Sequence, residues 1–144
     1  MKKTILTGII FSALLYTLTL SSEIMKLRVK VTNIESDKGK VMVALYNSKE
    51  SYENGKSEPY RYASLEIQKG ESNWEVDSLP AGEYAIKLYH DENDNQKMDK
   101  NIVGIPKESY GFSNNAPARF GPPSFEDAAF QVDKEETIQV IKIN

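Results

Sequence analysis

The sequence contains no cysteine and only one histidine among its 144 residues. Without cysteine the chain has no disulfide bonds, no thiol nucleophile and no cysteine-ligated metal site. It holds only 8 glycines and 6 prolines, which excludes a collagen-like or low-complexity chain. Hydrophobic residues make up 40% of the chain and charged residues 27%. These fractions are typical of a packed globular domain, and the length suits one domain.

An excess of positive charge and the common catalytic motifs are absent as well. The formal net charge is −3, whereas nucleic-acid binding depends on clustered lysine and arginine, so we expect no nucleic-acid partner. The chain has no Gly-x-Ser-x-Gly turn, no His-Glu-x-x-His pair, no P-loop and no dinucleotide fingerprint. The single histidine, His90, leaves a weak hydrolase as the least favoured alternative. We therefore expect a protein that is not an enzyme.

The longest apolar run lies at the N-terminus. Lys2 and Lys3 precede a mostly apolar segment, residues 5–20, and the small residues Ser21 and Ser22 follow it. This order is typical of a secretory signal peptide, and the run is shorter than the roughly 20 apolar residues of a transmembrane helix. The sequence predicts a signal peptide over residues 1–22 and a single β-sandwich domain over residues 23–144. We expect export to the periplasm or the extracellular space, with no transmembrane anchor after cleavage.

Downstream of this segment, apolar and polar residues alternate with a period of two, which is the period of a β-strand. The alternation is clearest at residues 27–31, 41–45 and 84–90. The first two segments flank a turn and predict a β-hairpin with one buried face. Shorter strands are expected at residues 62–67, around 74–76, at 128–132 and at 137–143. In the last of these the apolar positions change phase between Val140 and Ile141, which indicates a β-bulge or burial on both faces.

About seven short strands without a helical stripe predict an all-β fold, namely an antiparallel β-sandwich with one long ordered loop. Tyr84 follows Pro80 and Gly82 at the start of a strand. A tyrosine at such a corner buries its ring and bonds its hydroxyl to nearby backbone. We expect Tyr84 and Trp74 to be core residues.

The long loop spans residues 91–125, which lack sustained periodicity. Disordered linkers are poor in aromatic residues, whereas this segment contains Tyr110, Phe112, Phe120 and Phe125. We therefore expect an ordered loop folded over one end of the sandwich. Its aromatic side chains either cap the core or form a ligand surface. The second possibility describes a glycan- or peptide-binding module, and burial of the four side chains would remove its site.

Oxygen-bearing side chains alternate at the start of this loop, as in an EF-hand calcium loop. The candidate ligands are Asp91, Asn93, Asn95, the carbonyl of Lys97 and Asp99. Gln96 stands where glycine normally supplies a positive φ, and Ile102 stands where a bidentate acid closes the EF-hand shell. Glu108, Asp127 or water would have to complete the shell. The pattern predicts a weak calcium site, with a solvated acidic loop as the alternative.

Several short motifs occur along the chain in a specific order. They are GKVMVALY at 39–46, LPAGEYA at 79–85, HDEN at 90–93, GIPKE at 104–108, YGFSNNA at 110–116 and PSFEDA at 123–128. In this order they resemble the bacterial family catalogued as domain of unknown function 2141. The resemblance covers essentially the whole chain after residue 22 and implies an exported β-sandwich of Ig-like or prealbumin-like type, with no established activity. In that family the acidic segment is usually closer to Asp-x-Asn-x-Asn-Gly-x-x-Asp, so Gln96 departs from its glycine turn.

These observations together favour an exported, non-catalytic β-sandwich that acts as a structural or interaction module. Calcium is its one expected cofactor, bound weakly. An extracytoplasmic glycan, peptide or protein is the expected kind of partner.

Overall fold

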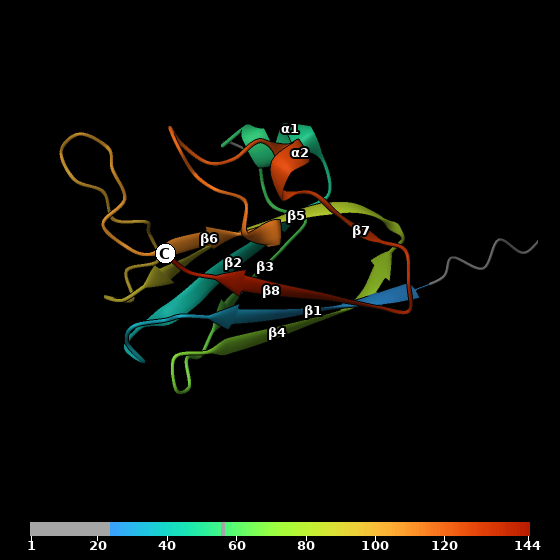
Figure 1. Cartoon of the computed structure of the whole chain (residues 1–144), viewed down its shortest axis with the longest axis horizontal. Helices are drawn as coiled ribbons and strands as arrows, with labels where there is room; N and C mark the ends of the chain where they lie inside the picture. Colours follow the sequence, from blue (N-terminus) through green and yellow to red (C-terminus); the bar gives the residue numbers. More distant parts are fainter. Residues whose placement is uncertain (1–23, 56) are drawn as a thin grey trace, which may run out of the picture.

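Two β-sheets pack face to face in the computed structural model, which describes residues 24–55 and 57–144 (Figure 1). The first sheet has the strand order β4-β1-β8 and consists of β1 (Ile24–Thr32), β4 (Ser72–Pro80) and β8 (Glu136–Lys142). The second has the order β3-β2-β5-β6 and consists of β2 (Lys40–Tyr46), β3 (Arg61–Leu65), β5 (Gly82–Asp91) and β6 (Tyr110–Phe112). The short strand β7 (Phe130–Val132) also pairs with β5. The predicted signal peptide, residues 1–22, lies outside the described residues.

One hydrophobic core fills the space between the sheets, and it is built from the alternation seen in the sequence. Leu27, Val29 and Val31 of β1 and Val41 of β2 are at most 1% exposed. Side chains of a strand alternate between its two faces, so these residues point into the core while their polar neighbours face outward. The prediction of an all-β sandwich is therefore confirmed.

The predicted hairpin between residues 27–31 and 41–45 is wrong. β1 pairs with β4 and β8, whereas β2 pairs with β3 and β5, so the two segments lie in different sheets. The connecting turn is bonded to another turn instead, because Asp37 accepts hydrogen bonds from the backbone of Lys69 and Gly70 at 3.0 and 2.8 Å. Alternation specifies which face of a strand is buried, but not which strand is its neighbour.

The predicted bulge or two-faced burial in the last strand is wrong too. β8 runs parallel to β1 in continuous register from Lys26↔Glu136 to Thr32↔Lys142, which adds one parallel pair to the otherwise antiparallel sandwich. Ile141 is buried, but Ile138 and Val140 point outward and are 59% and 47% exposed. The change of phase reflects apolar residues on the outer face, where β-branched side chains still suit an extended backbone.

Tyr84 forms the predicted tyrosine corner. Its ring is buried and its hydroxyl donates to the Pro80 carbonyl at 2.9 Å. Trp74 is only partly buried and packs against the border of the core, because β4 is an edge strand of the first sheet. Its predicted place in the core is correct only in part.

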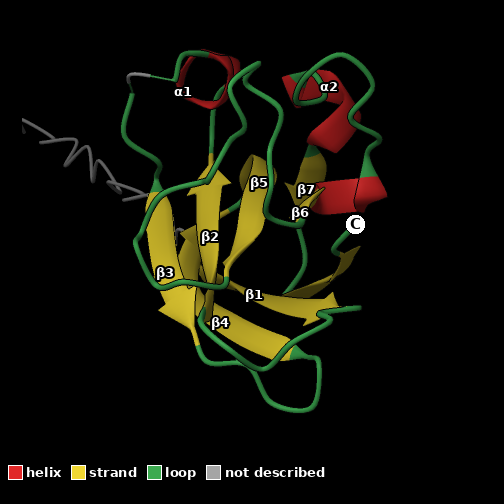
Figure 2. Cartoon of the chain, turned by 90° about the vertical axis from the view of Figure 1, so that its left-hand side faces the viewer, coloured by secondary structure: helices red, strands yellow, loops and turns green. Residues whose placement is uncertain are grey.

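Two short helices and a 3-10 turn cover the second sheet near one end, where Figure 2 shows the helices in red above the yellow strands. They are α1 (Lys49–Glu53), η1 (Ser113–Asn115) and α2 (Phe125–Ala128). Ser48 and Ser124 cap the two α-helices by accepting a backbone N–H. A second, smaller core joins the helices to the sheet through Tyr52, Ala85, Phe125 and Ala128. In the described part of the chain, no helix has the length and apolar character needed to cross a membrane.

Candidate functional site

The outer face of the second sheet brings Tyr110 and Phe112, which the sequence singled out, next to side chains that it did not. The strand registers place these residues in two rows across the sheet. The first row is Tyr62, Ala44, Lys87 and Phe112, and the second is Ser64, Met42, Tyr89 and Tyr110. Outward-facing positions of a half-exposed sheet are normally polar. Most of these are aromatic or apolar, so this face forms an apolar floor.

Two loops, residues 98–106 and 118–122, border this floor. In Figure 1 both project from the same face of the second sheet, coloured gold and orange. The floor and the loops enclose a groove of about 780 Å³, which lies within the range of about 300 to 1,000 Å³ typical of small-molecule sites. Met98, Val103, Ile105 and Pro106 line it from the first loop, and Ala118 to Pro122 from the second. We call this feature the outer groove.

The rim of the outer groove exposes large apolar side chains to solvent. Phe120 is 106% exposed, Val103 72% and Ile105 58%. Tyr62, at the edge of the floor, is 72% exposed. A contiguous apolar patch of this kind marks a surface that contacts a ligand, a partner or a membrane.

The structure divides the predicted aromatic surface. Tyr110, Phe112 and Phe120 all line the outer groove, but Phe112 is itself buried, with 8% of its surface exposed. Phe125 does not belong to this surface, because it is 6% exposed and its ring packs against Tyr52 with the ring centroids 5.8 Å apart. Its place at the start of α2 turns it toward the smaller core. The long segment borders the outer face of the second sheet through its residues 98–106 and 118–122.

The charged residues that line the outer groove are all cationic, namely Lys87, Lys100 and Arg119. Lys87 lies on the floor with its Nζ 4.0 Å from the centroid of the Tyr52 ring and 5.3 Å from that of Tyr46. The same Nζ donates to the Tyr52 carbonyl. Burial lowers the pKa of Lys87, and the charge of Glu53 partly offsets this effect. No sequence motif marks these residues, because a lone lysine on a strand is usually a solvated outer position.

The candidate calcium ligands lie together in a tight loop, residues 91–99, beside the outer groove. We call this segment the acidic loop. Asp91 is fully buried, and its two carboxylate oxygens accept the backbone N–H groups of Asn95 and Gln96 at 3.0 and 2.7 Å. The side-chain amides of Asn93 and Asn95 donate to the Asp99 carboxylate at 2.7 and 3.1 Å. The loop therefore folds so that backbone and amide N–H groups surround the carboxylates of Asp91 and Asp99.

The structure separates the candidates for completing a metal shell. Glu108 lies at the loop, where its carboxylate accepts the N–H of Asp99 at 2.9 Å, whereas Asp127 is bonded to Ser124 in α2. Gln96 adopts φ 62°, so it takes the left-handed conformation that glycine usually supplies. Ile102 is fully exposed and bears no ligand atom.

The donor set also determines what kind of cation the loop suits. Within residues 24–55 and 57–144, no three His, Asp or Glu side chains form a group that could hold a metal ion. A cation here would depend on the amide oxygens of Asn93 and Asn95 and on the Lys97 carbonyl, together with Asp91 and Asp99. Such an oxygen-only set fits calcium and does not fit zinc.

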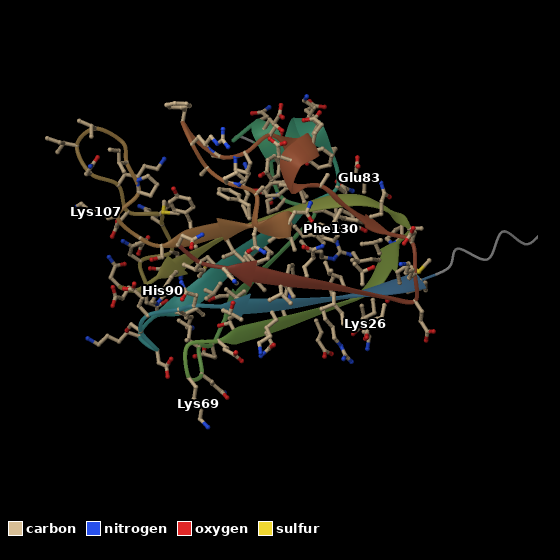
Figure 3. The ribbon with its side chains drawn as sticks, in the orientation of Figure 1. Lys26, Lys69, Glu83, His90, Lys107 and Phe130 are labelled. Carbon is tan, nitrogen blue, oxygen red and sulfur yellow. The ribbon has the colours of Figure 1, made fainter. Side chains whose placement is uncertain are left out.

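His90 connects the acidic loop to the rest of the sheet. Its ring is 6% exposed, and Nε2 donates to the Lys38 carbonyl at 2.7 Å. Its backbone N–H bonds to the Ser109 carbonyl at 2.8 Å, and Figure 3 shows His90 and Lys107 at the same end of the molecule. His90 therefore links the end of β5 to the turn before β2 through its ring and to Ser109 through its backbone.

Comparison with known proteins identifies one similarity. A family model described as an uncharacterized protein conserved in bacteria (DUF2141) matches residues 29–139. The matched range runs from β1 to β8 and includes the outer groove and the acidic loop. No curated protein and no solved structure matches the chain.

Proposed function

Because the chain belongs to the DUF2141 family of uncharacterized bacterial proteins, we propose its function from the site itself: it is an exported, non-catalytic module that binds an apolar ligand in the outer groove. One observation carries this proposal. The outward face of a sheet, where polar residues are the rule, is apolar here and is bordered by two loops with exposed apolar rims.

The composition of the groove favours an apolar ligand over a glycan. Aromatic platforms such as Tyr62 and Phe120 suit both ligand classes. Met42, Met98, Val103 and other aliphatic side chains occupy much of the remaining lining, and the lining contains no carboxylate that could accept bonds from sugar hydroxyls. Small-molecule sites in proteins usually have this composition, with a mostly hydrophobic lining and a few polar groups that orient the ligand.

The absence of enzymatic activity is part of the same proposal. Histidine is the side chain that most often serves as a general base in enzymes. His90, however, is buried and donates from Nε2 to a backbone carbonyl. It does not line the outer groove. Export rests on residues 1–22 and is tested separately below.

The acidic loop supports the groove mechanically. Lys107 N–H donates to the Asp99 carbonyl at 2.8 Å, and Lys100 bridges to Pro106, so Asp99 lies at the base of the loop that forms one wall. We propose that the acidic loop also binds calcium weakly, with Asp91, Asn93, Asn95, Lys97 and Asp99 as ligands. A bound calcium ion would join the Asp91 and Asp99 carboxylates and thereby stiffen the base of that wall.

Binding of the uncharged fluorophore N-phenyl-1-naphthylamine to the mature protein tests the groove. We expect saturable fluorescence enhancement, loss of binding in Ala44→Trp, which fills the floor, and about fivefold weaker binding in Phe120→Ser. Ile138→Ser is the matched control, since Ile138 is exposed on the other sheet. The proposal is wrong if Ala44→Trp binds like the wild type, or if Ile138→Ser weakens binding as much as Phe120→Ser.

A further inference from the structure

We propose that the ligand of the outer groove is a small amphiphilic anion, namely a single apolar chain that bears one carboxylate. This inference rests on the proposed function and adds the charge of the ligand. Its basis is the placement of Lys87, Lys100 and Arg119 around an otherwise apolar groove.

The charge of the groove is opposite to that of the whole chain. The sequence has 21 acidic and 18 basic residues, yet the three charged residues in the lining are all basic. One comes from each surface: Lys87 from the floor, Lys100 from the first loop and Arg119 from the second. An anion inside the groove therefore meets a cation on the floor and on each wall, and no carboxylate belongs to the lining, although the charge of Glu53 reaches Lys87 and the charges of Asp91, Asp99 and Glu108 reach Tyr89.

Lys87 provides the most specific part of the argument. Its ammonium group has three donors, and among the described residues one hydrogen-bond acceptor, the Tyr52 carbonyl, takes one of them. The rings of Tyr46 and Tyr52 flank the group and hold it by cation–π attraction. A partly buried cation gains more from an anionic partner than a solvated one does, because water screens the attraction less.

Lys100 and Arg119 are exposed, and neither has an ion-pair partner in the part of the chain that the structure describes. Lys26, Lys30 and Lys49, by contrast, each pair with an aspartate or glutamate at 2.7 to 3.3 Å. The two groove cations are thus available on opposite walls. An arginine and a lysine at the mouth of an apolar groove suit a carboxylate head whose tail lies on the floor.

The test displaces N-phenyl-1-naphthylamine from the mature protein with three ten-carbon competitors: decanoate, decanol and decylammonium. We expect decanoate to displace the probe at concentrations at least tenfold lower than decanol, and decylammonium to be the weakest. Raising the salt concentration should weaken decanoate and leave decanol unchanged, because salt screens only the charge interaction.

Two double variants locate the effect. Lys100→Gln with Arg119→Gln should weaken decanoate about tenfold and leave decanol unchanged. Lys134→Gln with Lys142→Gln removes the same charge from exposed positions that do not line the groove, and it should change decanoate less than twofold. The single variant Lys87→Met, with a side chain of similar length, should reduce the preference for decanoate over decanol.

The outcomes distinguish this inference from the function on which it rests. If the probe binds but decanol competes as well as decanoate, the groove function stands and the anionic ligand is wrong. Equal losses in the two double variants, or none in either, also overturn it. If the wild type does not bind the probe at all, the groove function itself is wrong. Binding to vesicles of anionic phospholipid without displacement of the probe would mean that the rim contacts a membrane instead, and it too contradicts the inference.

Discussion

Among the described residues, Tyr52 has a buried side-chain hydroxyl that forms no hydrogen bond. It is 1% exposed, and its hydroxyl oxygen is buried without a hydrogen-bond partner. Its ring nevertheless contacts Tyr46, Phe125 and the Lys87 ammonium. Burying an unpaired polar group costs about 1 to 3 kcal/mol. The contacts of the Tyr52 ring therefore offset the cost of burying its hydroxyl.

Removing that hydroxyl should stabilise the protein. We expect Tyr52→Phe to raise the free energy of unfolding by about 1 kcal/mol, because the ring contacts remain while the unpaired group is removed. Tyr84→Phe should lower it by about 1 kcal/mol, since the Tyr84 hydroxyl donates to the Pro80 carbonyl at 2.9 Å. Urea denaturation of the two variants measures both values. Shifts of the same sign in the two variants would contradict this interpretation.

The buried tyrosines also predict how stability depends on pH. Burial raises the pKa of Tyr46, Tyr52, Tyr84 and Tyr89 above the ordinary value of 10.0. Above pH 10 the unfolded chain releases these protons while the folded chain retains them, so the free energy of unfolding should fall as the pH rises. The lowered pKa of Lys87 makes the free energy of unfolding rise with pH, but this single group opposes four tyrosines.

Urea midpoints measured from pH 8 to pH 11 test this expectation, and Tyr52→Phe should make the fall above pH 10 less steep. Absorbance of the phenolate should show tyrosines that ionise only when the protein unfolds. A midpoint that stays constant or rises above pH 10 would rule the explanation out.

At the scale of elements, the acidic loop depends on a close approach to the turn before β2. Gly39 has φ 68°, and a Cβ at this position would lie within 3 Å of the backbone of Asp91 and Glu92. Only glycine combines a left-handed backbone with this contact. The start of the acidic loop is thus packed against the turn as tightly as two backbones allow.

Gly39→Ala should lower the free energy of unfolding by at least about 2 kcal/mol, because backbone strain and a steric clash act together. Gly55→Ala is the matched control, since among the described residues no atom outside its immediate chain neighbours lies within 4 Å of a Cβ at that position, and it should change the value by less than about 0.5 kcal/mol. Thermal or urea denaturation measures both. Equal effects at the two glycines would show that the close approach carries no energetic weight.

Calcium should stabilise the folded protein through the same loop. A ligand that binds only the native state at a hundredfold excess over Kd adds about 2.7 kcal/mol, which corresponds to a rise in Tm of about 10 °C for a domain of this size. Extracellular calcium modules bind at about 0.1 to 1 mM, and the shell here lacks a closing bidentate acid. The titration therefore has to reach about 10 mM, at constant ionic strength.

Magnesium and two aspartate variants control the calcium experiment. Magnesium requires tighter octahedral geometry and should raise Tm much less. Asp99→Ala should abolish the calcium effect, whereas Asp94→Ala should preserve it, because Asp94 is exposed and outside the candidate ligand set. The calcium proposal is abandoned if both metals act equally or if Asp99→Ala leaves the effect intact.

At the scale of the whole molecule, one shared core holds two sheets whose outer faces differ. The outer face of the first sheet carries ion pairs such as Arg28 with Glu75 and Lys30 with Glu71. The outer face of the second carries the outer groove. Surface ion pairs contribute little stability, but they make the outer face of the first sheet more polar than that of the second, even though Ile138 and Val140 are exposed there.

The proposed export would determine where that face meets its proposed ligand. The pattern over residues 1–22 predicts that the native protein begins at Ser22 or Glu23. Intact-mass measurement of protein recovered from the periplasm or the medium checks this expectation. Full-length chain recovered from a membrane fraction would show that the apolar run is retained as an anchor.

Strand positions and buried faces were predictable because alternation is a local property of the sequence. The tyrosine corner was predictable for the same reason, since Pro80, Gly82 and Tyr84 are close in the chain and form the turn among themselves. Strand pairing was not predictable in this way. Residues 27–31 and 41–45 both needed a buried partner, and each found it in strands far away in the sequence, β4 and β8 for the first segment and β3 and β5 for the second.

The sequence by itself determined the all-β class, the buried faces of the main strands and the oxygen-rich spacing of the acidic loop, because each depends on neighbours within a few residues. Only the tertiary structure decided the outer groove. Its floor combines residues from four strands, its walls come from two loops, and its cations, Lys87, Lys100 and Arg119, are 13 or more positions apart in the chain. Pairing energies between distant segments bring these groups together, and no local pattern encodes them.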